Sequence, residues 1–292
     1  MITTALDLIV SGLFLGSIYS LVAVGMSLLY GVSQMINLAH GDFMIAGSYI
    51  TFVFVTSLGL SPLYVMAATA CIMGAIGVVL YKFVGFSSIL EKPLARGERE
   101  FITLLLTFAF IWVLTNLLAW IFTANFKTYP SLPGSIMIGD LTLPVRKLIT
   151  ILTTIPLVIA IWLVVKKTWY GLGIRCVFDD DTAARLMGIK TSRVHMFIFF
   201  ISFLMAGVGG ALYSMNYPIT PYLGMEYTMM AFVATILGGV GSIKGALLGG
   251  MIVGLVESIS MFFLAPLLKI AVVYSLLIAV LLIKPSGLFK TM

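Results

Sequence analysis

The side chains of this sequence that could do chemistry are few, and they gather in four places. The first is a polar break between two apolar runs, which holds Asn37, His40, Gly41 and Asp42. If this break lies at membrane depth, these groups could satisfy exposed backbone or line a water-filled cavity, because unpaired backbone groups are costly in lipid. A short turn with a helix cap at the membrane surface would use the same residue types, so both interpretations stay open.

The second place is rich in glycine. Three glycines fall within four residues and a serine follows them: Gly238, Gly239, Gly241 and Ser242. This density destabilises a helix locally and predicts a kinked or interrupted helix, as is common beside transport pathways. The pairs Gly12/Gly16 and Gly250/Gly254 are spaced by four residues, which is more typical of helices that pack closely.

The third place predicts a short helix outside the membrane. Asp179, Asp180 and Asp181 suit a helix N-terminus, where carboxylates meet free amide groups, and Gly188 suits its end. The apolar side chains of this helix lie in a loop too polar to enter lipid, so they need a partner, either another protein or the rest of the chain. The residues concerned are Asp181, Thr182, Ala183, Ala184, Leu186, Met187 and Gly188.

The fourth place is Glu257, an acid in an otherwise apolar run. Ionisable side chains inside a membrane are costly and by default suggest function. An interfacial position or a buried hydrogen bond to a neighbouring helix would account for it equally well.

Motifs of catalysis are absent from the sequence. It has no G-x-x-x-x-G-K-[ST] phosphate loop, no H-E-x-x-H, no G-x-S-x-G and no cysteines at metal-binding spacing. We therefore expect no enzyme activity, no ATP hydrolysis and no bound metal or cofactor in this chain. Cys71 and Cys176 fall in an apolar run and a polar loop, so no disulfide is expected.

The composition indicates a membrane protein. Of the 292 residues, 61% are hydrophobic and 10% are charged, whereas a soluble domain carries roughly 25% charged residues. Apolar runs of about 20 residues, the length that crosses a bilayer, recur along the chain. They predict an all-α polytopic transmembrane helical bundle and a single domain over 1–292. The predicted segments are 6–30, 43–58, 62–86, 101–124, 148–165, 194–214, 228–240, 244–263 and 269–284.

The segment count is eight or nine, because 228–240 is too short to cross alone. It is either half of a broken helix or fuses with the next segment across the glycines. The first run is too long for a cleaved signal peptide and has no basic flank, so we expect it to remain as a membrane segment.

Basic residues predict the orientation. Of the 17 lysines and arginines, 13 fall on one side, including Lys290 and those in the loops 87–100 and 166–193. The other side holds four, which are Lys127, Arg146, Lys147 and Lys269. Positive charge concentrates on the cytoplasmic side, so we expect an external N-terminus, an external loop at 125–147 and a cytoplasmic C-terminus. Since the cations sit in short gaps between apolar runs, they do not indicate a nucleic-acid partner.

Four stretches together resemble the permeases of ABC importers for branched-chain amino acids, specifically the H-type subunit. They are the segment from Ile36 to Met44 followed by Gly47-Ser48-Tyr49, the segment from Thr182 to Ile189, the segment from Ala231 to Gly250, and the ending Lys284-Pro285-Ser286-Gly287-Leu288-Phe289. The resemblance covers nearly the whole chain in the expected order. It departs at Asp181-Thr182, where the family's docking helix begins with a Glu-Ala pair.

The resemblance implies an assembly in the inner membrane of a bacterial or archaeal cell. The chain would pair with a second, related permease and with two cytoplasmic ATPase subunits, which would bind ATP and magnesium. A periplasmic or extracellular binding protein would deliver the substrate. The segment 181–189 would be the coupling helix, with Ala183, Ala184, Leu186 and Met187 pressed into a groove on the ATPase.

Two alternatives stay open on the sequence. Permeases with very similar motifs handle urea, short amides or aromatic acids. A self-contained secondary transporter would need a coupling acid at mid-membrane, for which Glu257 is the one plausible residue.

Overall fold

The structure is a bundle of long helices. The computed structural model describes residues 2–92, 94–138, 141–264 and 268–289. Seven of the described helices are long and apolar enough to cross a membrane. They are α1 (Ile2–Ser33), α2 (His40–Leu58), α3 (Pro62–Phe83), α5 (Arg96–Phe122), α6 (Val145–Lys167), α9 (Thr191–Ser214) and α11 (Ile243–Phe263). Two further helices of 15 residues each, α10 (Gly224–Gly238) and α12 (Lys269–Ile283), complete the bundle. The predicted all-α polytopic membrane bundle is confirmed.

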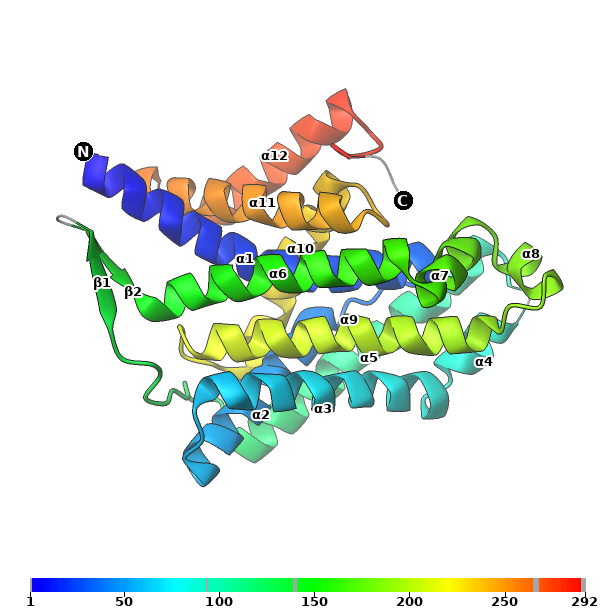
Figure 1. The fold of residues 1–292 in the computed structure, drawn as a ribbon, viewed down its shortest axis with the longest axis horizontal. Helices are drawn as coiled ribbons and strands as arrows, with labels where there is room; N and C mark the ends of the chain where they lie inside the picture. Colours follow the sequence, from blue (N-terminus) through cyan, green and yellow to red (C-terminus); the bar gives the residue numbers. More distant parts are fainter. Residues whose placement is uncertain (1, 93, 139–140, 265–267, 290–292) are drawn as a thin grey trace.

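Short elements connect the long helices at the two ends of the bundle (Figure 1). One end carries an antiparallel hairpin of β1 (Ser135–Ile138) and β2 (Leu141–Pro144), in which Ser135 pairs with Pro144. The other end carries α4 (Phe86–Glu91), α7 (Trp169–Asp179) and α8 (Asp181–Leu186). The predicted cytoplasmic loops therefore share one end of the bundle, and the hairpin of the predicted external loop lies at the other. Lys290 lies outside the described residues.

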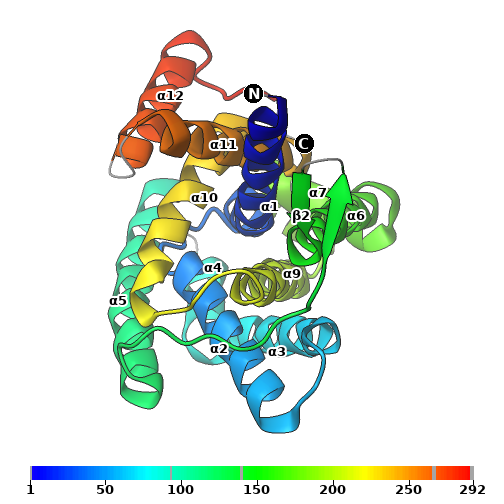
Figure 2. The same cartoon turned by 90° about the vertical axis from the view of Figure 1, so that its left-hand side faces the viewer.

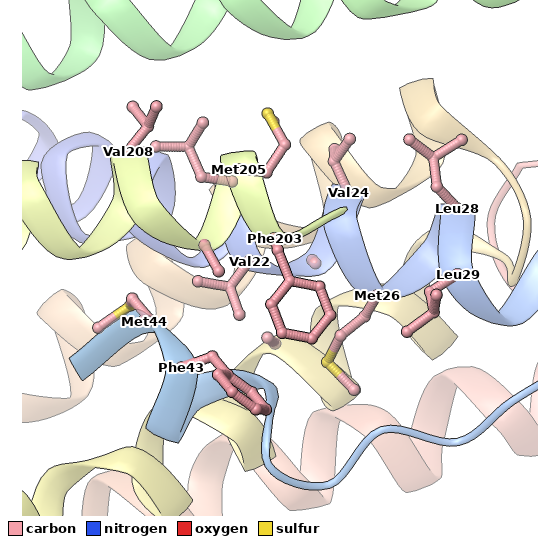
Figure 3. Close-up of a cluster of buried hydrophobic side chains, with 14 of the residues drawn as sticks. Val22, Val24, Met26, Leu28, Leu29, Phe43, Met44, Phe203, Met205 and Val208 are labelled. Atoms are coloured by element: carbon pink, nitrogen blue, oxygen red, sulfur yellow. The ribbon is translucent and has the colours of Figure 1, made fainter. Parts of the chain in front are cut away.

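Helix α1 occupies the centre of the bundle. It packs against α11, α9, α10 and α6 (Figures 1 and 2). Figure 3 shows side chains of α1, α2 and α9 gathered in one cluster, with Val22, Phe43 and Phe203 among them. By contrast, only 17% and 28% of the residues in the apolar stretches of α5 and α6 are buried. Because lipid is as apolar as these side chains, close packing rather than exclusion of water stabilises the centre.

Glycine pairs allow α1 and α11 to pack closely. Gly12 and Gly16 of α1 face α11, where a Cβ on Gly12 would lie 2.8 Å from the Leu255 Cα. A Cβ on Gly254 would collide with the backbone of Gly16. The small residues spaced by four thus allow the two backbones to approach, as the sequence predicts.

The first polar break lies deep in the bundle. After α1, the coil 34–39 leads to α2, whose first residue, His40, is fully buried. The space beside Gly25 of α1 shows the depth, since a Cβ there would lie 2.8 Å from His40 Nε2 and 2.9 Å from the Ser202 carbonyl oxygen of α9. Gly25 lies eight residues, about 12 Å, inside the end of α1 at Ser33. The break is therefore buried inside the bundle, which favours the interpretation at membrane depth over a turn at the surface.

The second break separates two helices. Helix α10 ends at Gly238, Gly239 and Gly241 adopt φ values of 99° and 82°, and α11 begins at Ile243. The Ser242 hydroxyl caps α11 by accepting a hydrogen bond from the Gly245 N–H at 3.1 Å. Left-handed backbone of this kind strongly favours glycine, so the alternative in which the two segments fuse into one helix is wrong.

Candidate functional site

The coil 34–39 is held by side chains on both flanks. The Asn37 Oδ1 accepts the Ala39 N–H at 3.1 Å, and its Nδ2 lies 3.4 Å from His40 Nδ1. From α5, the Thr107 hydroxyl accepts the Leu38 N–H at 3.2 Å and lies 3.1 Å from the Ile36 carbonyl. The non-helical backbone at this depth thus finds partners inside the protein, as it must in a bilayer. A threonine in an apolar helix gives no sequence signal for this role, which is why Thr107 was not among the predicted residues.

The N-termini of α2 and α10 meet at this depth. The Gly41 N–H donates to the Thr228 hydroxyl of α10 at 2.9 Å, and Gly224, the first residue of α10, packs against Asp42. The Thr115 hydroxyl of α5 donates to Asp42 Oδ1 at 3.2 Å. The Asp42 carboxyl therefore lies at the positive ends of two helix dipoles, where negative charge is favoured.

Two buried polar atoms at this junction have no hydrogen-bond partner among the described residues. They are Asp42 Oδ2 and His40 Nε2, on side chains that are 2% and 0% exposed. Helices that begin inside a membrane and present their N-termini to one point are the arrangement that many transporters use at their substrate sites.

A cavity joins the two predicted breaks. It has a volume of about 160 Å³ and lies between α1, the coil 34–39 and α10. Asn37 lines it from the first break and Val240 from the second, with Tyr30, Phe232 and Ile236 between them. Residues about 200 positions apart in the sequence thus face one space.

Residues 288–289 pack against the glycine break and hydrogen-bond to the end of α10. The Leu288 N–H donates to the Leu237 carbonyl at 2.9 Å, and the Phe289 N–H donates to the Gly238 carbonyl at 3.2 Å. A Cβ on Gly239 would collide with the Phe289 carbonyl, so this contact requires glycine. From α1, the Ser27 hydroxyl accepts the Gly241 N–H at 3.0 Å.

Glu257 lies far from the glycine break but is linked, through Lys269, to Glu226 near the start of α10. It is 14 residues, about 21 Å, along α11 from Ile243. Its carboxylate accepts the Tyr19 hydroxyl at 2.5 Å and pairs with Lys269 at 3.0 Å. Lys269 also pairs with Glu226 of α10 at 2.8 Å. The buried hydrogen bond that was one interpretation of Glu257 is present, and sequence spacing gave no signal for these partners.

Helix α8 forms as the sequence predicts and leaves part of its apolar surface exposed. The Asp180 carboxylate accepts the N–H groups of Thr182 and Ala183 at 2.8 and 3.0 Å. Gly188 has a φ of 84° just after its end. The side chains of Leu186 and Met187 are 85% and 70% exposed.

Ala184 requires a correction. We expected its side chain to face an ATPase, but it is fully buried within this chain. Ala184 therefore anchors α8, and Leu186 and Met187 form its exposed surface.

Polar contacts tie α8 to α4 and α9, and His195 of α9 extends the network to α1. Arg185 pairs with Asp181 at 2.9 Å and donates to the Leu90 carbonyl of α4 at 3.0 Å. Asp181 Oδ1 lies 3.6 Å from His195 Nε2 of α9, and His195 Nδ1 lies 2.9 Å from the hydroxyl of Ser33 at the end of α1. Burial alone would raise the pKa of Asp181, but the nearby His195 ring and Arg185 guanidinium outweigh it and hold that pKa below its usual value.

Among the residues that the structure describes, no three His, Cys, Asp or Glu side chains come together in a way that could hold a metal ion. The polar groups of the site lie around a break in the bundle, where they hydrogen-bond to backbone and side-chain atoms.

Comparisons with known proteins extend this picture. Residues 8–281 match the family described as branched-chain amino acid transport system / permease component. The chain is 32% identical to the high-affinity branched-chain amino acid transport system permease protein LivH of Escherichia coli, over 95% of this chain and 93% of that protein. It is 30% identical to the corresponding protein BraD of Pseudomonas aeruginosa, over 97% and 95% of the two chains. Among solved structures, a chain of PsaBC from Streptococcus pneumoniae in complex with Fab matches with a TM-score of 0.48 and 15% identity, over 94% of this chain and 91% of that chain.

Proposed function

Since this chain belongs to the family of permease components of branched-chain amino acid transport systems, we propose that it is the membrane permease subunit through which an ABC importer carries branched-chain or other hydrophobic amino acids. The observation that carries the proposal is the family match over residues 8–281. The meeting of two helix N-termini inside the bundle supports it, because it offers polar groups at membrane depth.

The proposed energy source is ATP hydrolysed on partner subunits. The sequence has no phosphate loop, so ATP and magnesium would bind to two cytoplasmic ATPase subunits and no cofactor would bind to this chain. The exposed Leu186 and Met187 of α8 would contact an ATPase. A second, related permease and an external substrate-binding protein would complete the importer.

The proposed orientation follows the basic residues. The end that carries α4, α7 and α8 would face the cytoplasm of a bacterial or archaeal cell, and the hairpin of β1 and β2 would face outward. The N-terminus would be external and the C-terminus cytoplasmic.

The proposed path for the substrate includes the junction of α2 and α10. The cavity between the coil 34–39 and α10 would form its inner part, with Asn37 and Tyr30 in its wall. Glu257 would have an indirect role in the path, because its carboxylate is already bound by Tyr19 and Lys269. Helix α10 follows a short 3-10 helix, Pro221–Leu223, and is followed by the glycine-rich break, where small backbone rotations could open the path.

Reconstitution tests the proposal. Proteoliposomes containing this chain, a second permease and the ATPase subunits, supplied with the binding protein, should accumulate radiolabelled leucine only when ATP is present at the ATPases. Competition with isoleucine, urea, acetamide and phenylalanine would identify the solute class. Accumulation of leucine against a gradient by this chain alone would contradict the importer assignment, and preferential uptake of urea or acetamide would contradict the substrate assignment.

A further inference from the structure

A large cavity lies on the face of the bundle opposite the junction of α2 and α10. It has a volume of about 540 Å³ and is bounded by α3, α7 and α9. In Figure 2, α3 and α7 lie on the side of the bundle away from α5 and α10, and Figure 1 shows α7 at the end that carries α8. Its inner wall is apolar, with Val78, Ile174, Phe197 and Phe200 among the lining side chains.

Cations stand at the mouth of this cavity. Lys190 and Arg193 line it where the loop before α9 enters the helix, and both side chains are exposed. Neither takes part in the ion pairs found among the described residues. An adjoining cavity of about 380 Å³ shares Arg193 and adds Lys82, with Glu91 as the acid in its lining. The mouth therefore carries more positive than negative charge.

The distance from the cations to the apolar floor matches the upper part of a lipid. From Arg193 to Phe200, α9 advances seven residues, or about 10 Å. Trp169 and Tyr170 of α7 line the same cavity and are 87% and 74% exposed. Amphipathic rings in such positions mark the level of the headgroups, so the cations lie at the surface of the bilayer and the phenylalanines lie beneath it.

We propose that this cavity binds an anionic phospholipid of the cytoplasmic leaflet. The phosphate lies between Lys190 and Arg193, and one acyl chain runs over Phe197 and Phe200. Charge complementarity selects an anionic headgroup, because basic pockets between helices on this side of a membrane attract acidic lipids. A free phosphate ion could pair with Lys190 and Arg193 at the mouth, but it would leave the apolar inner part of the cavity unfilled. The site stands apart from the proposed substrate path and does not depend on it.

Gly173 provides a way to fill the cavity without changing its charge. It lines the apolar part, and the nearest atom to a Cβ built there is Val194 Cγ2 at 3.6 Å, an ordinary contact. A leucine at this position would therefore enter the space that the acyl chain occupies, and the helix backbone would not have to move.

Native mass spectrometry of the full chain in neutral detergent micelles tests the site. The chain is titrated with dioleoyl phosphatidylglycerol and, separately, with dioleoyl phosphatidylcholine, and should bind the anionic lipid more tightly. The double variant Lys190→Gln/Arg193→Gln should lower the affinity for phosphatidylglycerol roughly thirtyfold, because each surface cation contributes about 1 kcal/mol. The affinity for the zwitterionic phosphatidylcholine should stay nearly unchanged. The matched control Lys92→Gln/Lys167→Gln removes two exposed cations at the same end and should retain the wild-type preference.

Two further measurements distinguish a bound lipid from a bound phosphate ion. Gly173→Leu should lower the affinity for both lipids. A large excess of inorganic phosphate should not displace phosphatidylglycerol from the wild-type chain. The proposal is overturned if the Lys190/Arg193 double variant keeps the wild-type preference, if the control pair loses it equally, or if phosphate alone displaces the lipid. Gel filtration of each variant establishes that it remains folded, and the Lys190/Arg193 result decides the question if Gly173→Leu aggregates.

Discussion

Gly41, near the start of α2, lies against Gly224, the first residue of α10, so closely that a methyl group on either glycine would overlap atoms of the other helix. The contact joins two helices that both begin inside the bundle. It also holds the Asp42 carboxyl between their N-termini, where the two helix dipoles favour it.

Replacing Gly41 with alanine should therefore disrupt the junction. The new methyl group would collide with the Gly224 carbonyl and the Thr228 backbone, and overpacking of this kind costs about 1–3 kcal/mol. We expect a lower thermal unfolding midpoint of the purified chain and loss of uptake by the reconstituted importer. Gly97→Ala is the matched control, because no atom lies within 4 Å of a Cβ there. Equal behaviour of the two variants would show that the close contact is not required.

The ion pair of Glu257 gives a prediction about stability. Lys269→Met would leave the Glu257 carboxylate buried beside Tyr19 without its cation, and breaking one side of a buried pair costs on the order of 3–5 kcal/mol. The double variant Glu257→Gln/Lys269→Met removes both charges and should recover most of the lost thermal stability. If the single variant were as stable as the wild type, the pair would have no structural role.

The exposed and buried faces of α8 should respond differently to charge. Leu186→Asp changes a side chain that is 85% exposed, so the purified chain should keep its thermal stability but lose co-purification with the ATPase subunits. Ala184→Asp places a charge in the chain's own interior and should lower the stability of the chain itself. Ser88→Asp, at an exposed position of α4 at the same end of the bundle, serves as the control for added charge. Retention of the ATPase by Leu186→Asp would rule out docking through this surface.

The lowered pKa of Asp181 predicts how its contacts respond to acid. A carboxyl whose pKa is lower in the folded chain contributes stability above its unfolded pKa, near 3.9, and loses that contribution as the pH falls through the folded value. The difference in unfolding midpoint between the wild type and Asp181→Asn should stay constant from about pH 7 to 5 and narrow below about pH 4. Asp179→Asn, at an exposed position, should show no such difference. If the difference in unfolding midpoint between the wild type and Asp181→Asn grew as the pH fell, ionised Asp181 would not be the stabilising form.

Cysteine labelling tests the orientation. In a background in which Cys71 and Cys176 are replaced by alanine, a cysteine at Lys167 should react with a membrane-impermeant maleimide only from the cytoplasmic side. A cysteine at Lys127 should react only from the outside. Lys167 ends α6 just before α7, whereas Lys127 lies between α5 and β1, and Figure 1 shows α7 and the hairpin of β1 and β2 at opposite ends of the bundle. Labelling of both from one side would contradict the proposed topology.

Several features follow from short stretches of sequence. The apolar runs predict the membrane helices because the length of a run and its lack of charge are local properties, and the structure confirms the bundle. The glycine break follows from local backbone preference, since Gly239 and Gly241 adopt positive φ. The cap of α8 at Asp180 and its end near Gly188 are equally local.

Other features depend on the tertiary structure. The sequence by itself left the depth of Asn37 and His40 open, because a surface turn and a membrane break use the same residue types. Packing places His40 beside Gly25 of α1 and Asp42 beside Gly224, inside the bundle. The inward side chain of Ala184 and the pairing of Glu257 with Lys269 were decided in the same way. The length, charge and glycine content of each stretch determined where helices form. Contacts between distant segments decided which polar groups share a site, because residues that meet only in the folded chain leave no periodic pattern in the sequence.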